Sequence, residues 1–164
     1  MNKLRAVLLV IFILASFISY GQSAELEQNK KVKLVITELF NAYKDGDSTR
    51  VRAVFADDAH VQTISKTPDG ADKLSNLQSV DGFIKYIGGG LPEVHDEKLW
   101  DIQIHSDGQL ATLWTRYAFF LGEKFIHCGT ETFLLRKVKS EWKIFYLVDT
   151  RQKTGCKLPT EIKK

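Results

Sequence analysis

The sequence predicts an α+β domain in which three helices near the amino-terminal end lie on one face of an antiparallel sheet. Two observations carry this prediction. Apolar residues recur at three- and four-residue spacing over Leu26 to Lys44, as in an amphipathic helix. Residues 99–150 instead form four alternating runs separated by the turns Asp107-Gly108, Gly122-Glu123 and Lys139-Ser140, which is typical of linked hairpins.

The segments between these two regions complete the order of elements. Gly46 is suited to end the first helix, and Asp47 or Ser48 can cap the next one. Four segments then follow: a short helix over Thr49 to Phe55, a strand over Ala59 to Ser65, a loop over Lys66 to Ser79 and a helix over Val80 to Ile87 that Gly88-Gly89-Gly90 stops. Helices therefore precede the main strands, as the fold class requires.

The first 21 residues have the pattern of a secretory signal peptide. Lys3 and Arg5 precede an uncharged, mainly apolar run, and small residues stand before a cleavage site after Gly21. The alternative is an uncleaved membrane anchor, but the run of about 15 residues is shorter than the ~20 that span a bilayer. We expect a domain over residues 22–156, a flexible tail over 157–164, and export to the periplasm or the medium.

Charge excludes some partners. The chain has 23 Lys and Arg against 20 Asp and Glu, and removal of the leader brings it close to neutral. Scattered charges of both signs indicate neither a nucleic-acid partner nor, after cleavage of the leader, a membrane surface.

The two cysteines, Cys128 and Cys156, leave two interpretations open. Export permits a disulfide, because the tail can curl back to the strand that holds Cys128. The alternative is a buried thiol and an exposed one. Their spacing does not predict a metal site, and we expect no metal and no cofactor.

Several segments resemble the NTF2-like superfamily, which includes the ketosteroid isomerases, the scytalone dehydratases and the SnoaL-like cyclases. Gly46-Asp47 with residues 54–61 (VFADDAHV) resembles its helix-to-strand junction, and residues 127–133 (HCGTETF) with 142–144 (WKI) resemble its last hairpin. Asp149-Thr150-Arg151 with a following Cys is similar to an exported bacterial branch of unassigned activity. The resemblance implies a cone-shaped fold over residues 28–152, and no particular function.

The resemblance to ketosteroid isomerase does not favour its mechanism. The general base of that enzyme falls on Thr63, and its tyrosine donor falls near Leu39. Its second donor, a carboxylic acid, falls near Glu131. At best one of three roles is retained, so steroid isomerisation is not expected.

Turn positions predict which side chains share a face of the sheet. Two-residue loops place a mixed set of apolar and polar side chains on one face, and we assign that face to a pocket under the helices. Its walls are predicted to be Trp114, Phe133, Trp142, Tyr146 and Ile144, and its polar groups Arg116, His127 and Glu131. A one-residue bulge would reverse the assignment and bring Asp149, Thr130 and Tyr117 into the pocket instead.

The polar groups allow more than one interpretation. His127 can act as a general acid or base, with Arg116 and Glu131 beside it, or it can be a half-buried histidine satisfied by its neighbours. Glu131 and Arg116 can equally form a structural ion pair. Asp149 is a candidate ligand-binding residue, but it can also cap or pair with Arg151, or have a surface role.

The functional prediction is therefore a binding protein for a small, partly apolar molecule. The alternatives are a cofactor-free isomerase, dehydratase or hydrolase that uses His127, and an interaction module without a ligand. Both faces of the sheet are rich in apolar groups, so a homodimer through the sheet is expected. The alternative is that long Lys and Arg side chains shield the aromatic residues.

Overall fold

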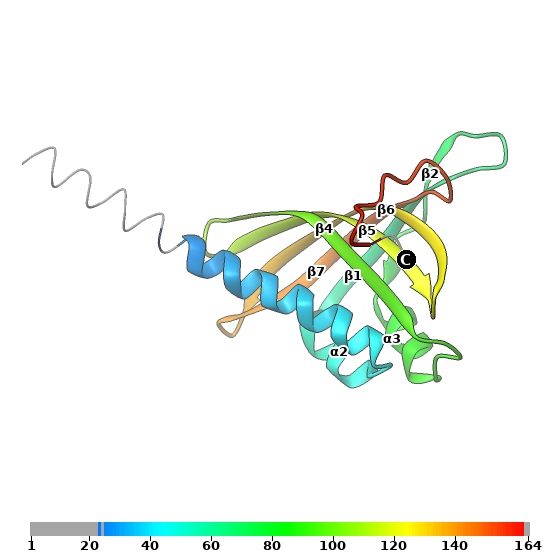
Figure 1. Ribbon diagram of the computed structural model, residues 1–164. Coiled ribbons are helices and arrows are strands. Elements are labelled where there is room, and N and C mark those ends of the chain that lie inside the picture. Colours follow the sequence, from blue (N-terminus) through cyan, green and yellow to red (C-terminus); the bar gives the residue numbers. More distant parts are fainter. Residues whose placement is uncertain (1–22, 24, 163–164) are drawn as a thin grey trace, which may run out of the picture.

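The computed structural model describes residue 23 and residues 25–162. In that part of the chain, three helices lie on one side of a curved seven-stranded sheet (Figure 1). The first helix covers residues 25–44, α2 covers Ser48–Val54 and α3 covers Asp81–Gly88. The predicted α+β architecture is confirmed. The predicted leader, residues 1–21, lies outside the described residues.

The sheet has the strand order β2-β1-β7-β6-β5-β4, and β3 also pairs with β1. Its strands are β1 (Phe55–Lys66), β2 (Asp72–Leu74), β3 (Gln78–Ser79), β4 (His95–Ser106), β5 (Leu110–Leu121), β6 (Lys124–Val138) and β7 (Glu141–Arg151). β1 and β7 run parallel and the other pairs run antiparallel. Two short strands thus lie inside the segment predicted as a loop. In the described residues, no helix is both long and apolar enough to cross a bilayer.

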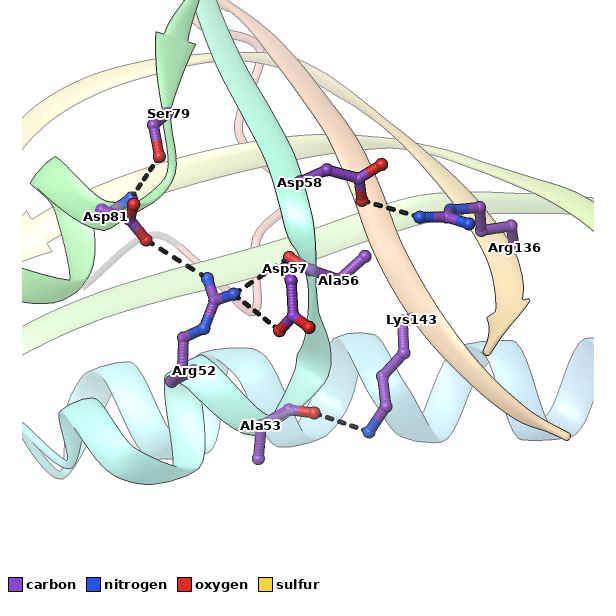
Figure 2. A network of polar contacts seen from close by, with 9 residues as sticks. All are labelled: Arg52, Ala53, Ala56, Asp57, Asp58, Ser79, Asp81, Arg136 and Lys143. Atoms are coloured by element: carbon purple, nitrogen blue, oxygen red, sulfur yellow. Dashed lines mark hydrogen bonds and ion pairs between the residues drawn. The ribbon is translucent and has the colours of Figure 1, made fainter. Parts of the chain in front are cut away.

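Polar contacts fix the junction between α2 and β1. Asp47 caps α2, since its Oδ1 accepts the backbone N–H groups of Thr49 and Arg50 at 3.0 Å each. At the other end, Arg52 donates to Asp57 Oδ1 at 3.1 Å and to Asp81 Oδ1 of α3 at 3.4 Å. Figure 2 shows these contacts of Arg52 and two further ones. Lys143 of β7 donates to the carbonyl of Ala53, and Arg136 of β6 donates to Asp58. The junction therefore holds α2 and α3 against the start of β1.

The first helix supplies most of the apolar cover for one end of the sheet. Four residues of its apolar stripe are buried and Val35 and Phe40 are partly buried, as the spacing predicted. It belongs to one core cluster with the inward side chains of β5, β6 and β7: Val32, Ile36, Leu39, Leu113, Phe133, Leu135, Trp142 and Ile144. We call the face of the sheet that carries these residues the concave face, and the other the convex face.

Two of the three predicted two-residue turns are present, whereas the turn at Asp107-Gly108 is longer because Ser106 pairs with Ala111, and bulges change the register. Leu121 pairs with Lys124, and Val138 with Glu141, as two-residue loops require. Between Phe119 and Phe120 the register shifts by one residue, so that Phe119 rather than Ala118 lies opposite His127. A second shift lies at the Leu134 and Leu135 pairs with β7. Trp114 therefore pairs with Thr132, whereas uninterrupted pairing from a two-residue loop would place it opposite Glu131, because one extra residue moves every following side chain to the opposite face.

The carboxyl-terminal segment lies on the convex side. Cys128 and Cys156 form a disulfide, with Cα atoms 6.1 Å apart, which resolves the two alternatives left open by the sequence. Ile162 is 7% exposed and joins a small core cluster with Ala118, Phe120 and Cys128. In Figure 1 this segment (red) lies on the side of the sheet away from the first helix. The flexibility expected for residues 157–164 stays a prediction, but Ile162 gives the tail a packing site.

Candidate functional site

A cavity of about 390 Å³ lies on the concave face, at the end where the first helix no longer fills the sheet. Helices, β1 and the main sheet all contribute to its wall. Its lining consists of Leu39, Phe40 and Tyr43 of the first helix, Phe83 and Tyr86 of α3, Val61, Gln62 and Thr63 of β1, Gln78, Glu97, Phe119, His127, Glu131, Leu147, Asp149 and Arg151. Its size is within the range of small-molecule pockets.

Three predicted site residues lie on this wall. His127 and Glu131 come from β6, and Asp149 comes from β7 directly opposite Glu131. Odd-numbered positions of β6 face the helices at this end, so alternation places both β6 side chains in the cavity. The structure thus brings together residues that the sequence analysis had assigned to two alternative faces.

The other predicted site residues lie elsewhere. Trp114 and Arg116 are on the convex face, where Arg116 pairs with Asp101 at 3.4 Å and not with Glu131. Tyr146 is on the convex face as well, and its hydroxyl donates to Gln62 Oε1 at 2.6 Å. The cause is the pair of bulges described above. Of the residues predicted for the alternative face, Tyr117 points to the concave side but Thr130 does not.

Two aromatic residues predicted to form the walls are part of the packed core instead. Phe133 is 0% exposed, and its ring meets that of Phe40 edge-on at 6.1 Å. Trp142 is 5% exposed and donates to Gln28 Oε1 at 3.1 Å. Both lie on the predicted face, but in the part that the first helix fills.

Asp149 is the centre of the hydrogen-bond network in the cavity wall. Its Oδ1 accepts from the Thr63 hydroxyl at 2.6 Å. Its Oδ2 accepts from the Tyr117 hydroxyl at 2.9 Å and from Arg151 Nε at 2.6 Å. The predicted pairing of Asp149 with Arg151 is thus present, and the alternative surface role is not. Since Asp149 is 4% exposed, these three donors replace the water that a buried carboxylate would otherwise need.

Gly129 makes the contact of Tyr117 with β7 possible. Tyr117 lies on β5 directly opposite Gly129 of β6, and its hydroxyl also donates to the carbonyl of Thr150 at 3.0 Å. That carbonyl oxygen is 1.8 Å from the position that a Cβ on residue 129 would take. The missing side chain therefore lets β7 approach β6 closely, and the tyrosine reaches across β6 to Asp149.

Glu97 and Glu131 form a second, distinct polar group on the wall. Burial, reinforced by the nearby carboxylates of Glu97 and Asp149, raises the pKa of Glu131 well above its ordinary value. Burial also raises the pKa of Glu97 to about 7, although a hydrogen bond with Glu131 acts in the opposite direction. Two adjacent carboxyl groups that share a hydrogen bond cannot both be ionised without a large electrostatic cost. The pair therefore retains a proton near neutral pH.

Glu131 has an incomplete set of hydrogen bonds. It is 5% exposed, and its Oε2 atom has no hydrogen-bond partner among the described residues. Most buried polar atoms in folded proteins do have a partner, because an unpaired one costs about 1–3 kcal/mol. Because Glu131 lines the cavity, its carboxyl group is the polar group of the wall best suited to meet a bound molecule.

Histidines contribute uncharged rings near neutral pH. Burial, aided by the charge of Arg151, lowers the pKa of His127 to about 4. The His127 ring contacts those of Tyr117 and Phe119, with centroids 5.6 and 5.2 Å apart. His95 is 3% exposed, and its Nδ1 is 2.7 Å from the Tyr43 hydroxyl. Burial lowers the pKa of His95 as well, which favours its uncharged ring. Its contact with the Tyr43 hydroxyl positions that tyrosine.

Sequence reasoning missed Glu97, Tyr43 and His95. Glu97 precedes residue 99, where the first long strand was predicted to begin, although β4 starts at His95. Tyr43 was counted as part of an apolar helix stripe, which its ring does join. The position of Glu97 two residues before Leu99, on the same face of an extended strand, is the signal that could have identified it. In the described residues, no group of three His, Cys, Asp or Glu side chains is arranged to hold a metal.

Comparison with solved structures identifies the fold. The chain superimposes on an NTF2-like protein of unknown function from Shewanella baltica with a TM-score of 0.58 and 18% identity, covering 79% of this chain and 97% of that one. The chain has the NTF2-like fold. A protein of unknown function from Mycobacterium tuberculosis matches at a TM-score of 0.63 and 15% identity, over 79% of this chain and 75% of that one.

A third matched structure has a name that includes an activity. A protein from Novosphingobium aromaticivorans, provisionally named a scytalone dehydratase, matches at a TM-score of 0.60 and 15% identity, over 82% of this chain and 91% of that one. No family model and no curated protein matches the sequence. The resemblance noted in the sequence is confirmed for the fold, and at these identities the fold is what the likeness establishes.

Proposed function

We propose that this protein binds a small, partly apolar molecule in the cavity, with the Glu131 carboxyl group as its polar anchor. The observation that carries the proposal is the Glu131 carboxyl group, which belongs to the cavity wall and whose buried Oε2 atom has no hydrogen-bond partner in the described part of the chain. Aromatic and aliphatic side chains from helices and strands form most of the remaining cavity wall. An apolar wall with a few convergent polar groups is the usual composition of a ligand site.

The test is native mass spectrometry of the full chain purified from a bacterial host. We expect a bound small molecule on the wild-type protein that dissociates on collisional activation. Leu147→Trp, which places an indole in the cavity, should be free of it. Leu110→Trp is the matched control, because Leu110 is 47% exposed and lies away from the cavity. Equal loading of both variants would contradict the proposal.

A second candidate is a cofactor-free enzyme that transfers a proton. The observation in its favour is the pKa of about 7 at Glu97, which suits a general acid or base near neutral pH better than His127 does. Deuterium exchange at the benzylic carbon of phenylacetone in heavy water, followed by NMR, tests it. Faster exchange with the wild-type protein than with Glu97→Gln would support the enzyme, and equal rates would exclude this reaction.

Export and dimerisation are part of the same proposal. The leader pattern at residues 1–21 supports export to the periplasm or the medium. Half-buried aromatic side chains on the convex face, among them Trp114 and Tyr146, support a homodimer through that face. A mature amino terminus at Gln22 and a dimer mass in sedimentation are the expected results. A full-length product would contradict export with cleavage of the leader, and a monomer would contradict the dimer.

A further inference from the structure

We propose that the cavity selects molecules that carry a protonated amine on an apolar or aromatic body. This inference rests on the proposed function and specifies the chemical class of the ligand. Three features carry it: an excess of carboxyl groups over cations in the wall, a buried carboxyl oxygen without a partner, and a set of aromatic rings around the same space.

The charge balance of the wall favours a cation. The lining contains three carboxyl groups, those of Glu97, Glu131 and Asp149, and the single arginine among the described lining residues is Arg151. Arg151 already pairs with Asp149 at 2.6 Å. Glu97 and Glu131 are thus left without a cationic partner in the wall, and burial raises the pKa of both carboxyl groups.

An ammonium group can take over the role of the shared proton. It carries up to three N–H donors, which suits the unpartnered Oε2 of Glu131 together with an oxygen of Glu97. A ligand carboxylate would add a further negative charge beside three carboxyl groups. A neutral hydroxyl could satisfy one oxygen but would leave the second carboxyl group without a counter-charge.

Aromatic rings provide the second part of the recognition. On the wall, the ring of Tyr43 contacts those of both Phe83 and Phe119, with centroids 5.1 and 6.3 Å apart respectively. Phe40 and Tyr86 extend this surface. Faces of aromatic rings attract cations by ~0.5–2 kcal/mol and also bury the apolar part of a ligand. Carboxylates combined with such rings favour an amine over other compact polar molecules.

The experiment uses three probes with one carbon skeleton. 2-Phenylethylamine, 2-phenylethanol and phenylacetate differ in the charge of their polar group, and each is small against a cavity of about 390 Å³. An alkylamine has a pKa near 10, as lysine does, so the amine stays protonated from about pH 5.5 to pH 8. Any pH dependence of its binding therefore reports on the protein. Binding to the full chain is measured by NMR titration.

We expect the amine to bind about tenfold more tightly than the alcohol, which corresponds to ~1.4 kcal/mol. Its affinity should rise several-fold between about pH 5.5 and pH 8, because Glu97 loses its proton in that range. Glu131→Gln and Glu97→Gln should each weaken amine binding about tenfold and leave the alcohol unaffected. Glu141→Gln is the matched control, since Glu141 is exposed at the start of β7. A circular dichroism melt verifies that each variant is folded.

The outcomes separate the two proposals. Binding of the alcohol or of phenylacetate as tightly as the amine, lost in Leu147→Trp, would overturn the inference and leave the binding function intact. Failure of all three probes to bind would also overturn the inference, whereas the proposed function depends separately on the co-purified molecule.

Discussion

The concave face of the sheet differs between its two ends, although the same strands build both. At one end, Leu113, Phe133 and Ile144 are 0% exposed and pack in one cluster with the first helix. At the other end, Glu131 and Asp149 continue the same strands but face a cavity. Polar side chains thus occur where the helices no longer cover the sheet closely. An inward position on a strand therefore does not by itself identify a core residue or a site residue.

The largest expected effect comes from removing a ring at the packed end. Phe133→Ala should lower the free energy of unfolding by about 3–5 kcal/mol, because it deletes a fully buried ring and leaves a void under Phe40. Leu147→Ala at the cavity end should cost much less, since Leu147 already borders empty space. Urea denaturation measures both. Equal losses would show that the two ends are packed alike.

The disulfide is expected to act on the cavity end from the convex side. Replacing Cys128 and Cys156 together by Ser should cost about 2–4 kcal/mol, because the bridge closes a loop with a sequence separation of 28 residues. Amide exchange should accelerate around Ala118 and Phe120, which pack against the bridge, more than around Leu113. Uniform acceleration throughout the sheet would contradict a local effect.

A smaller effect is expected at the close approach of β6 and β7. Gly129→Ala places a methyl group against the Thr150 carbonyl and should cost about 1–3 kcal/mol while separating Tyr117 from Asp149. Gly82→Ala is the control, because nothing lies within 4 Å of its Cβ position and α3 should be stabilised slightly. Thermal unfolding measures both variants. An unchanged melting temperature for Gly129→Ala would contradict the close packing.

The same strands show how far the sequence determines the structure. The first helix, the helix-before-sheet order and the two-residue turn at Lys139-Ser140 follow from periodicity and turn chemistry, and the structure confirms them. The turn at Asp107-Gly108 is present but longer than two residues, since Ser106 pairs with Ala111. The turn at Gly122-Glu123 was also placed correctly. The bulge beside this turn was not predicted. The neighbouring residues are all apolar, so the pattern does not indicate which one bulges: Phe119, Phe120, Phe125 and Ile126.

That single bulge decided most of the site prediction. It moved Arg116 and Trp114 to the convex face and placed His127 beside Phe119. Glu131 and Asp149 were each predicted, but on alternative faces, since a shift at the Leu134 and Leu135 pairs lies between the turn and their pairing. Long-range contacts such as that of Tyr43 with His95 depend on the closure of the whole cone, which no local pattern encodes.

The smallest expected effect is a pH dependence confined to the cavity end. Burial raises the pKa of Glu97 and of Glu131, so the folded state favours their protonated forms. Their presence costs no stability below the unfolded pKa of about 4.3, and the cost grows as pH rises toward the folded pKa, about 7 at Glu97. Glu97→Gln should therefore gain on the order of 1–2 kcal/mol over wild type between about pH 5 and pH 8, after allowance for solvent screening.

The matched control for this titration is Glu141, whose pKa shift has the opposite sign to that of Glu97. A hydrogen bond with Lys143 lowers the pKa of the exposed Glu141 carboxyl group. Glu141→Gln should therefore not raise the free energy of unfolding at high pH. Urea denaturation at a series of pH values, with both variants beside wild type, measures the difference. If the Glu97→Gln and wild-type curves run parallel from acid to pH 8, the two carboxyl groups do not share a proton. The cavity end then differs from the packed end in shape alone, because the electrostatic cost that a bound cation would relieve is absent.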